Sequence, residues 1–509
     1  MDKLAPEILA MIVSHLQPPL APFAVVSRKW QHAIEAHTFS RLELTSEEDE
    51  LQRFKSTLAS PRRRRLVRSL VFHIELVVPS EKRVWKLESK QEAAANNTIY
   101  TRAVVALFSI LAAWEHNPAL SLWISANSSV DGCEPLGHEP KHCHNGEPMW
   151  RIRGLFKYIN FDAETLRDLG GLPSVSAVAH FEHNNYRQVD PAVFSVFCAA
   201  LPGVEKMDWW FIAPPRRLPD LRRNFRSSAA DSLLETAALA GNLTQLTTLN
   251  IRWEDHDPRN HQFDPGNFLD PGSTSDRFSV AIRHISRLPS LRHLKLQCCF
   301  VVSKEVFEGT DPNNNGEELW RSLQTFGLEL SHTTPDGGWH FIGDPENALD
   351  IDERLSEYSG EEPAEFDSAD SDTSDWAPHL TWERENGMLP SFEYRCIPNP
   401  ATFVPLLLSM AAAVRRMPAL RELELGTASW SSAVQMRFNY YAPGYPKRFA
   451  WNTEEGAFHL AHAQESRWVI WRRSMVEEDS GLESNWRVPK NLRNALHETA
   501  SEECILILQ

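Results

Sequence analysis

The amino-acid sequence predicts an α/β protein, in which helices alternate with the strands of a parallel sheet. Three observations predict this class. A short apolar template recurs along the chain, segments with helical apolar spacing precede several of its copies, and a compact helical pattern comes ahead of all of them. At 509 residues the chain exceeds the size at which one hydrophobic core stops growing, so several units or a stacked array are expected.

Residues 1–42 predict three short helices. The first carries an apolar stripe at helical spacing, formed by Ile8, Leu9, Ile12, Val13 and Leu16. Pro18 and Pro19 end this helix, and Ser27 is a good N-cap for a third helix, in which Trp30 and Ile34 lie one turn apart. A unit of ~40 residues rarely builds a self-sufficient core, so part of its apolar surface is expected to pack against another part of the chain or a partner.

The same residues carry a resemblance. The run Leu4-Ala5-Pro6-Glu7-Ile8-Leu9, followed by Val26-Ser27-Arg28-Lys29-Trp30, by Ile34-Glu35 and by Phe39, resembles the F-box of fungal F-box proteins. Ala5 stands where the family commonly has proline, and Pro22 shortens or bends the second helix. The resemblance implies that these helices bind the Skp-type adaptor of a Skp–cullin–F-box ubiquitin ligase and, through it, a cullin. The positions that match the family's docking residues are Leu4, Pro6, Ile8, Leu9, Ile12, Leu16, Val26, Ser27 and Trp30.

Behind the helices, a template recurs with apolar residues two, five and seven places after a proline. Residues 288–296 and 417–425 are nearly identical copies, and weaker copies begin at Val67, Pro118, Pro173, Pro202, Leu246 and Leu323. Segments with helical spacing occupy residues 101–116, 190–201, 229–239, 277–288 and 403–417. Each unit is therefore predicted to form a helix, a short turn and a strand with alternating inward residues.

This pattern resembles a leucine-rich-repeat solenoid, in which neighbouring units stack to bury the apolar face that none can bury alone. The asparagine ladder of that family is missing and the spacing is longer than usual, so a non-solenoid α/β domain remains an alternative. The predicted repeat region covers residues 43–330, with a last repeat at 401–430. Strand residues between the apolar positions face away from the core, and four of them are candidate target-binding residues: Asp208, Asn250, Lys295 and Glu424.

Residues 331–400 are predicted to form an acidic insertion. Most of the net charge of −16 lies between Asp344 and Asp375, where Arg354 is the only basic residue. Few apolar residues accompany these acids, so the composition favours a disordered, solvated loop. An electrostatic contact for a basic partner, or a switch tuned by phosphorylation, is the alternative.

Residues 431–509 are strongly aromatic and are predicted to cap the repeat array, with residues 505–508 as a closing strand. A tryptophan-lined recognition pocket is the alternative interpretation.

The sequence gives no positive sign of catalysis or of a bound cofactor. No nucleophile elbow, phosphate-binding loop or zinc-protease motif is present, so a non-catalytic protein is expected. Cys133, His138, His142, Cys143 and His144 lie close together but have poor zinc-ligand spacing, and residues 311–316 only imitate the start of a calcium loop. We therefore expect no metal site. The run from Arg62 to Arg65 is interpreted as a solvated face rather than a nucleic-acid site.

Seven cysteines without disulfide-like spacing, no signal peptide and no long apolar run predict a soluble protein of the cytoplasm, the nucleus or both. Two functions follow. In the first, the chain is a substrate receptor that links an adaptor to a protein target for ubiquitin transfer. In the second, it is an interaction scaffold unconnected to ubiquitin, whose N-terminal helices pack on its own repeats.

Overall fold

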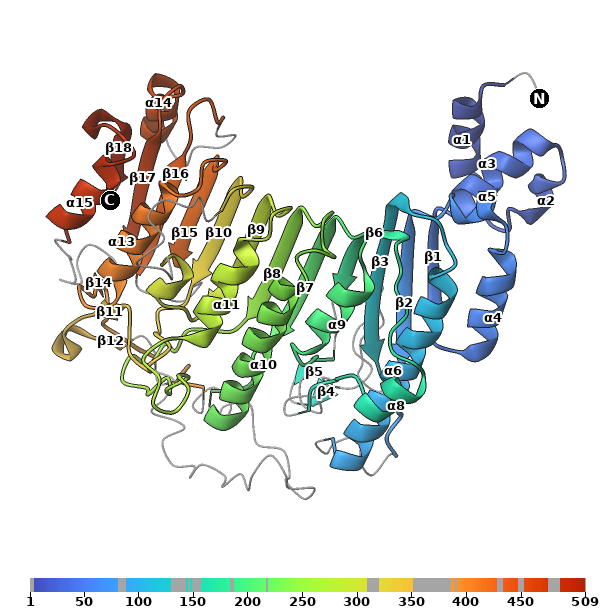
Figure 1. Ribbon diagram of the computed structural model, residues 1–509, viewed down its shortest axis with the longest axis horizontal. Coiled ribbons are helices and arrows are strands. Elements are labelled where there is room, and N and C mark those ends of the chain that lie inside the picture. Colours follow the sequence, from blue (N-terminus) through green and yellow to red (C-terminus); the bar gives the residue numbers. More distant parts are fainter. Residues whose placement is uncertain are drawn as a thin grey trace. The chain divides into compact units, whose positions relative to one another are not determined.

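The computed structural model describes residues 4–80, 88–129, 157–183, 187–216, 218–308, 320–350, 386–389, 391–427, 434–446, 453–474 and 486–508, together with the short strands β4 (Cys143–His144) and β5 (Glu147–Pro148). The chain divides into two compact units. Unit 1 comprises Met1–Val189, Val196–Trp209 and Asn242–Leu246, and unit 2 comprises Asp190–Ser195, Trp210–Gly241 and Thr247–Gln509. Both combine helices with mostly parallel strands (Figure 1), which confirms the predicted α/β class. The division falls within the predicted 43–330 region rather than at either of its ends.

Unit 1 begins with the three predicted helices and continues into parallel strands. Its helices are α1 (Pro6–Ser14), α2 (Ala21–Ala24), α3 (Arg28–Thr38), α4 (Glu48–Thr57), α5 (Pro61–Arg64), α6 (Lys90–Leu111) and α8 (Ala163–Asp168). Its strands follow the order β1 (Arg41–Thr45), β2 (Ser69–Glu75), β3 (Asn117–Asn127), β6 (Val178–His183) and β7 (Lys206–Ile212), the last of which ends in unit 2. Each neighbouring pair in this order is parallel.

Unit 2 repeats the same alternation. Its helices are α10 (Pro219–Ala238), α11 (Arg277–Ser286), α13 (Phe403–Val414), α14 (Thr453–Ala461) and α15 (Lys490–His497), and α9 (Val193–Ala200) begins in it. Its strands follow the order β8 (Thr248–Glu254), β9 (His293–Phe300), β10 (Thr325–Leu330), β15 (Glu422–Thr427), β16 (Val434–Tyr441), β17 (Arg467–Ser474) and β18 (Ile505–Leu508). Strand β16 is antiparallel to both of its neighbours, and the other pairs are parallel.

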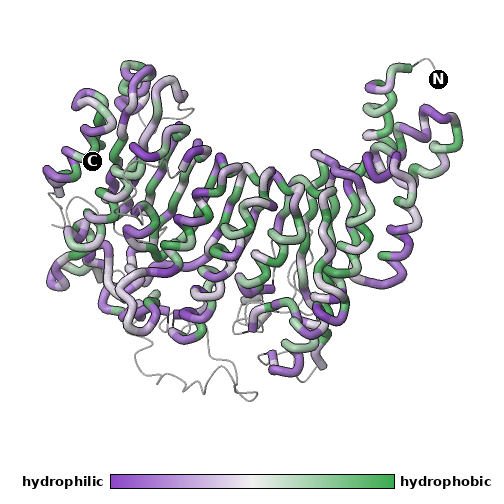
Figure 2. Tube along the Cα trace, viewed as in Figure 1, coloured by the Kyte–Doolittle hydropathy of each residue, from purple (hydrophilic) through white to green (hydrophobic). Residues whose placement is uncertain are grey.

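The template residues form the core of each unit. In unit 2, Leu249, Leu294, Phe326 and Leu423 are paired in one row across β8, β9, β10 and β15, and all four are buried. Figure 2 shows that hydrophobic residues recur along the strands and along the helices that follow them in the chain. Apolar side chains on alternate strand positions thus make a continuous buried layer, as the sequence pattern predicts.

Several elements differ from the prediction. Helix α6 begins eleven residues before the expected start, at a capping box in which the side chains of Ser89 and Glu92 each bond the other's backbone N–H. Strand β1 was not predicted, because Arg41 and Glu43 alternate with only two leucines over five residues. Strands β16 and β17 were predicted only as part of an aromatic cap.

The ends of the predicted 331–400 insertion are folded. Residues Ser331–Thr334, Phe341, Tyr394 and Cys396 are buried, and β11 (Phe341–Ile342) pairs with β14 (Ile397–Pro398). The interpretation as a disordered loop is therefore wrong for residues 331–346 and 391–400, because the aromatic and small polar side chains there pack and pair. Two further short strands, β12 (Leu349–Asp350) and β13 (Phe392–Glu393), also pair. Residues 351–385, which hold most of the acidic run, lie outside the described residues.

The aromatic C-terminal region contributes mainly to packing. Tyr440, Tyr441 and Trp468 are buried, and the rings of Tyr440 and Trp468 lie 5.2 Å apart. Residues 505–508 form β18, the last strand in the order, as predicted. Trp451 lies outside the described residues.

Candidate functional site

The N-terminal helices have a small core of their own. Leu9 and Val13 of α1 pack with Trp30 and Ile34 of α3, and all four are at most 7 % exposed. Ser27 caps α3, since its hydroxyl oxygen accepts a hydrogen bond of 3.4 Å from the backbone N–H of Trp30. The apolar residues at helical spacing therefore serve first to pack α1 against α3.

The nine predicted adaptor-binding residues fall into three groups. Leu9 and Trp30 belong to the core just described. Pro6, Ile8 and Val26 are exposed. Leu4, Ile12, Leu16 and Ser27 are half-buried at the border of that core. The second and third groups have the larger exposed surface for a direct contact with a partner.

Sequence reasoning missed three more exposed apolar side chains, one on α1 and two on or directly after α2. Met11 is 60 % exposed, Phe23 38 % and Val25 86 %, compared with 44 % for Ile8 and 56 % for Val26. We call these five residues the apolar surface of the N-terminal helices, and Figure 2 shows the hydrophobic residues along α1. The signal was present in the sequence, because Ile8 and Met11 are three residues apart and lie on the same side of a helix. Exposed apolar side chains on a small helical unit are candidates for contact with a partner.

A groove of about 560 Å³ lies between α1 and α3, and none of the five residues of the apolar surface lines it. Pro6 and Leu9 of α1 line one side, and Lys29 and His32 of α3 and Arg65 also contribute. A partner segment lying there would meet apolar and basic groups together.

The arginine run is used inside unit 1. Arg62 and Arg63 form ion pairs with Glu35 of α3, whose side chain is only 9 % exposed, and Arg65 bonds Glu115 at 2.6 Å. Arg64 donates hydrogen bonds to the carbonyl oxygens of two other residues. Burial raises the pKa of Glu35, but the bonds from Arg62, Gln31 and Arg63 outweigh it, so the pKa lies below its usual value. The contacts of Arg62 and Arg63 with Glu35 tie α3 to α5.

On the strands of unit 2, three of the four predicted target-binding residues come together. Asn250 of β8 pairs with Lys295 of β9, and Gly327 of β10 separates Lys295 from Glu424 of β15. Gly327 has no side chain, which leaves a gap between Lys295 and Glu424 in this row of outward-facing residues. Asp208 lies in unit 1 instead, where its carboxylate accepts bonds of 2.6 Å from His180 and 2.7 Å from Lys206.

This face of unit 2 carries mixed charge and aromatic rings. Arg252 lies over the ring of Trp210 at 5.2 Å, and Arg437 lies 5.9 Å from the ring of Trp471. Arg437 also faces Glu424, with 3.6 Å between nitrogen and oxygen. Arginine and tryptophan are enriched in protein recognition surfaces.

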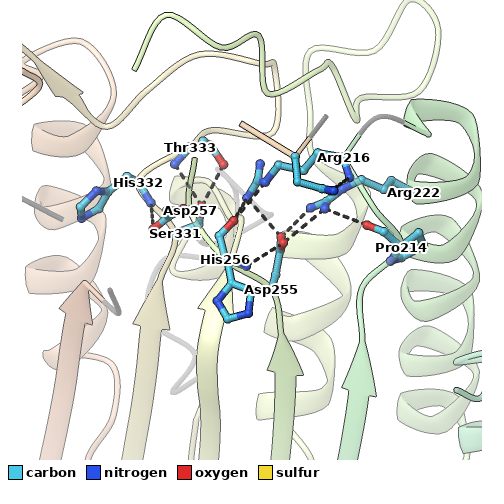
Figure 3. A network of polar contacts seen from close by, with 10 residues as sticks. Pro214, Arg216, Arg222, Asp255, His256, Asp257, Ser331, His332 and Thr333 are labelled. Carbon is cyan, nitrogen blue, oxygen red and sulfur yellow. Dashed lines mark hydrogen bonds and ion pairs between the residues drawn. The ribbon is translucent and has the colours of Figure 1, made fainter. Parts of the chain in front are cut away.

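A buried polar network lies past the carboxyl ends of the same strands (Figure 3). Arg222 donates to both oxygens of Asp255, which follows β8, and Arg216 reaches the same carboxylate at 3.3 Å. Asp257 accepts bonds from the hydroxyl of Ser331 and the backbone N–H of His332, which follow β10. Burial of Asp255 raises its pKa, but Arg216 and Arg222 outweigh it and keep the pKa below its ordinary value.

This network occupies the edge at which open α/β sheets often bind ligands. Its charged groups are nevertheless bound to one another: the side chains of Arg216, Arg222 and Asp255 are 1 %, 6 % and 7 % exposed. A carboxylate held by two buried guanidinium groups cannot act as a base or a nucleophile without breaking the ion pairs. We interpret the network as a structural link between the loops.

Three hypotheses from the sequence concern residues that lie wholly or largely outside the described part of the chain. These residues are the Cys133–His144 cluster, the calcium-like residues 311–316 and the acidic run beyond residue 350. Cys198, Cys298, Cys299, Cys396 and Cys504 are free thiols. Among the helices that the structure describes, none combines the length and the apolar character needed to cross a membrane. Comparison with family models and with curated proteins found no match to the chain.

Proposed function

We propose that the chain is the substrate-recognition subunit of a Skp–cullin–F-box ubiquitin ligase. In this proposal the N-terminal helices bind the Skp-type adaptor, which in turn binds a cullin, and the strand face of a leucine-rich-repeat-like solenoid binds a protein target. The chain itself makes and breaks no bonds, and it contributes proximity and orientation.

The observation that carries the proposal is the apolar surface of the N-terminal helices. The F-box-like motif falls on α1 and α3, and the helices carrying it leave Ile8, Met11, Val25 and Val26 in water after their own core is complete. Burying a side chain of this size contributes about 1.5–3 kcal/mol, so a partner that covers several of them would bind firmly.

The strand face of unit 2 supports the receptor role. Its outward row from Asn250 to Glu424 offers an amide, an ammonium and a carboxylate in register, which suits a folded or extended protein surface better than a small molecule. Repeat arrays commonly use such a face for binding.

A scaffold without a ubiquitin link is the second candidate. The ion pairs of Glu35 with Arg62 and Arg63 favour it, because they join α3 to the rest of unit 1. These ion pairs, however, do not cover the apolar surface of the N-terminal helices, which stays available for a partner.

Co-purification tests the proposal. The tagged full chain is expected to retain the Skp-type adaptor and a cullin, whereas Ile8→Glu with Met11→Glu removes both by placing charge in the interface. Val78→Glu is the matched control, since Val78 is an apolar residue of unit 1 that is 59 % exposed and lies outside these helices. Adaptor bound equally by all three proteins would place docking elsewhere, and no adaptor with any of them would favour the scaffold.

A further inference from the structure

Three side chains of metal-binding type meet at one edge of unit 2. His462 and Glu465 lie in the turn between α14 and β17, and Cys504 is the last residue of a short 3₁₀ helix, Glu502–Cys504, that leads into β18. Strands β17 and β18 are parallel neighbours, with Trp468 paired to Ile505. The turns that precede two parallel neighbours lie at the same edge, so the fold itself brings these residues together.

One ligand atom from each of the three residues lies within 4.8 Å of the others, close enough to share one metal ion, and either oxygen of Glu465 could serve. The Sγ atom of Cys504 lies 3.4 Å from Nδ1 of His462 and 3.2 Å from Oε2 of Glu465, and Nδ1 of His462 lies 3.3 Å from Oε1 of Glu465. With zinc bonds of about 2.3 Å to sulfur and about 2.0–2.2 Å to nitrogen and oxygen, tetrahedral angles place the ligand atoms about 3.3–3.6 Å apart. Thiolate, imidazole and carboxylate are all ligands that zinc takes.

The turn that carries two of the ligands is held in place by a buried cation. Arg467 is 1 % exposed, and its Nη1 donates hydrogen bonds of 3.4, 3.5 and 3.4 Å to the backbone carbonyl oxygens of His462, Ala463 and Glu465. Its Nη2 bonds the carbonyl oxygen of Tyr445 at 2.7 Å. The backbone of this turn is thus fixed before any ligand binds, which lowers the entropy lost on binding.

The sulfur has a supporting contact as well. The hydroxyl of Ser501 donates a hydrogen bond of 3.2 Å to Sγ of Cys504. Hydrogen bonds from outside the ligand set orient a coordinating thiolate and stabilise its charge.

The exposure of the three residues leaves room for a fourth ligand from solvent. Cys504 is fully buried, the side chain of His462 is 20 % exposed and that of Glu465 is 54 % exposed. A water molecule can therefore complete the coordination on the side of the glutamate.

A nucleophilic role for the cysteine fits these observations poorly. Reactive thiols are accessible and have a lowered pKa, whereas Cys504 has no exposed surface and burial raises the pKa of its thiol.

We propose that Nδ1 of His462, the carboxylate of Glu465 and Sγ of Cys504 bind one Zn²⁺ ion that fastens β18 to the turn before β17. On binding, the thiol proton of Cys504 passes to solvent and the thiolate becomes a ligand. Cys504 lies 39 residues after Glu465 in the chain, so the ion closes a long loop and stabilises the end of the sheet. This proposal is independent of the proposed function.

Zinc content of the full chain tests the site. The protein is stripped with a chelator, reconstituted with zinc chloride and freed of excess metal, and zinc per chain is measured by mass spectrometry. Cys504→Ala and His462→Gln are each expected to lose about one equivalent relative to the wild type. Cys396→Ala and His497→Gln, which change other residues of unit 2, are the matched controls. Both are expected to retain the same zinc content as the wild type. A double substitution of Cys133 and Cys143 to alanine also keeps this equivalent.

Equal zinc in the wild type and in both ligand variants would overturn the proposal, as would a wild type that retains none. Thermal unfolding gives a second readout. Zinc is expected to raise the melting temperature of the wild type and of Cys396→Ala but not of His462→Gln, whose side chain reaches the surface. Cobalt in place of zinc should give the visible bands of a tetrahedral ion and a thiolate charge-transfer band, and both disappear in Cys504→Ala.

Discussion

At the scale of single residues, burial separates the side chains that build the protein from those that can meet a partner. Leu9 and Trp30 match the F-box-like motif as well as Ile8 does, yet both are core residues. A sequence motif identifies the positions that matter, but it does not say whether the residue at each position builds the core or contacts a partner. Polar residues show the same division, because Glu35 and Asp255 are held in internal ion pairs while Glu424 and Lys295 lie on the strand face.

Replacing Glu35 tests the link between α3 and α5. Glu35→Gln is expected to lower the free energy of unfolding by about 1–2 kcal/mol, because it weakens the bonds with Arg62 and Arg63, whose side chains are partly exposed. Urea denaturation at neutral pH measures this. Glu43→Gln, in the exposed pair with Arg41, is the control and should change stability by less than about 0.5 kcal/mol. Equal effects of the two substitutions would contradict the role of Glu35.

His261 gives a prediction about pH. Its Nδ1 accepts hydrogen bonds of 2.8 Å from the backbone N–H groups of Tyr394 and Arg395, so the ring is neutral in the folded state. Burial, with smaller contributions from His332 and Arg395, lowers the pKa of His261 to about 3. As pH falls below the usual histidine value of about 6.5, the unfolded chain takes up a proton that the folded chain refuses, and stability falls.

We therefore expect His261→Gln to be less stable than the wild type at pH 7 but to lose less stability on going from pH 7 to pH 5, by about 1–2 kcal/mol. Denaturant unfolding at the two pH values measures the difference. His256→Gln, at an exposed position near the same loop, is the control. An unchanged pH dependence in His261→Gln would show that His261 is not buried as a neutral ring.

At the scale of elements, the strands of the repeats were predictable because the template alternates buried and outward residues. Residues 288–296 and 417–425 fell on β9 and β15, and the remaining copies fell on or immediately before β2, β3, β6, β7, β8 and β10. Strand β1 was not predictable in this way, since its charged residues interrupt the pattern over a short length. The Asp257–Ser331 bond and the meeting of Cys504 with His462 join residues far apart in the chain, so no local pattern reports them.

The two faces of β9 should respond differently to substitution. Leu296 is 1 % exposed and paired with buried residues of β8 and β10, so Leu296→Ala is expected to cost about 2–5 kcal/mol of stability. Gln297 is the next residue and exposed, so Gln297→Ala should change stability by less than about 0.5 kcal/mol. Chemical denaturation of both variants checks the assignment, and a register shifted by one residue would reverse the two results.

At the scale of the whole molecule, the chain carries two different kinds of surface. The N-terminal helices expose apolar side chains, as an element that binds a constant partner would, and the strand face of unit 2 offers mixed charge, as a surface for a particular target would. The class of the fold follows from sequence periodicity. The identity of the partners does not follow from sequence periodicity, because a binding surface consists of the residues that the core leaves exposed.

Calorimetric titration of the purified full chain with a Skp-type adaptor tests whether the N-terminal helices bind the adaptor. The wild type and Val78→Glu are expected to bind with a dissociation constant of about 1 μM or tighter and a negative heat-capacity change, because apolar surface is buried. Ile8→Glu with Met11→Glu is expected to weaken binding by about 100-fold or more while leaving the melting temperature near that of the wild type, since both side chains are exposed. No heat of binding for the wild type, or equal affinity for all three proteins, would contradict the account.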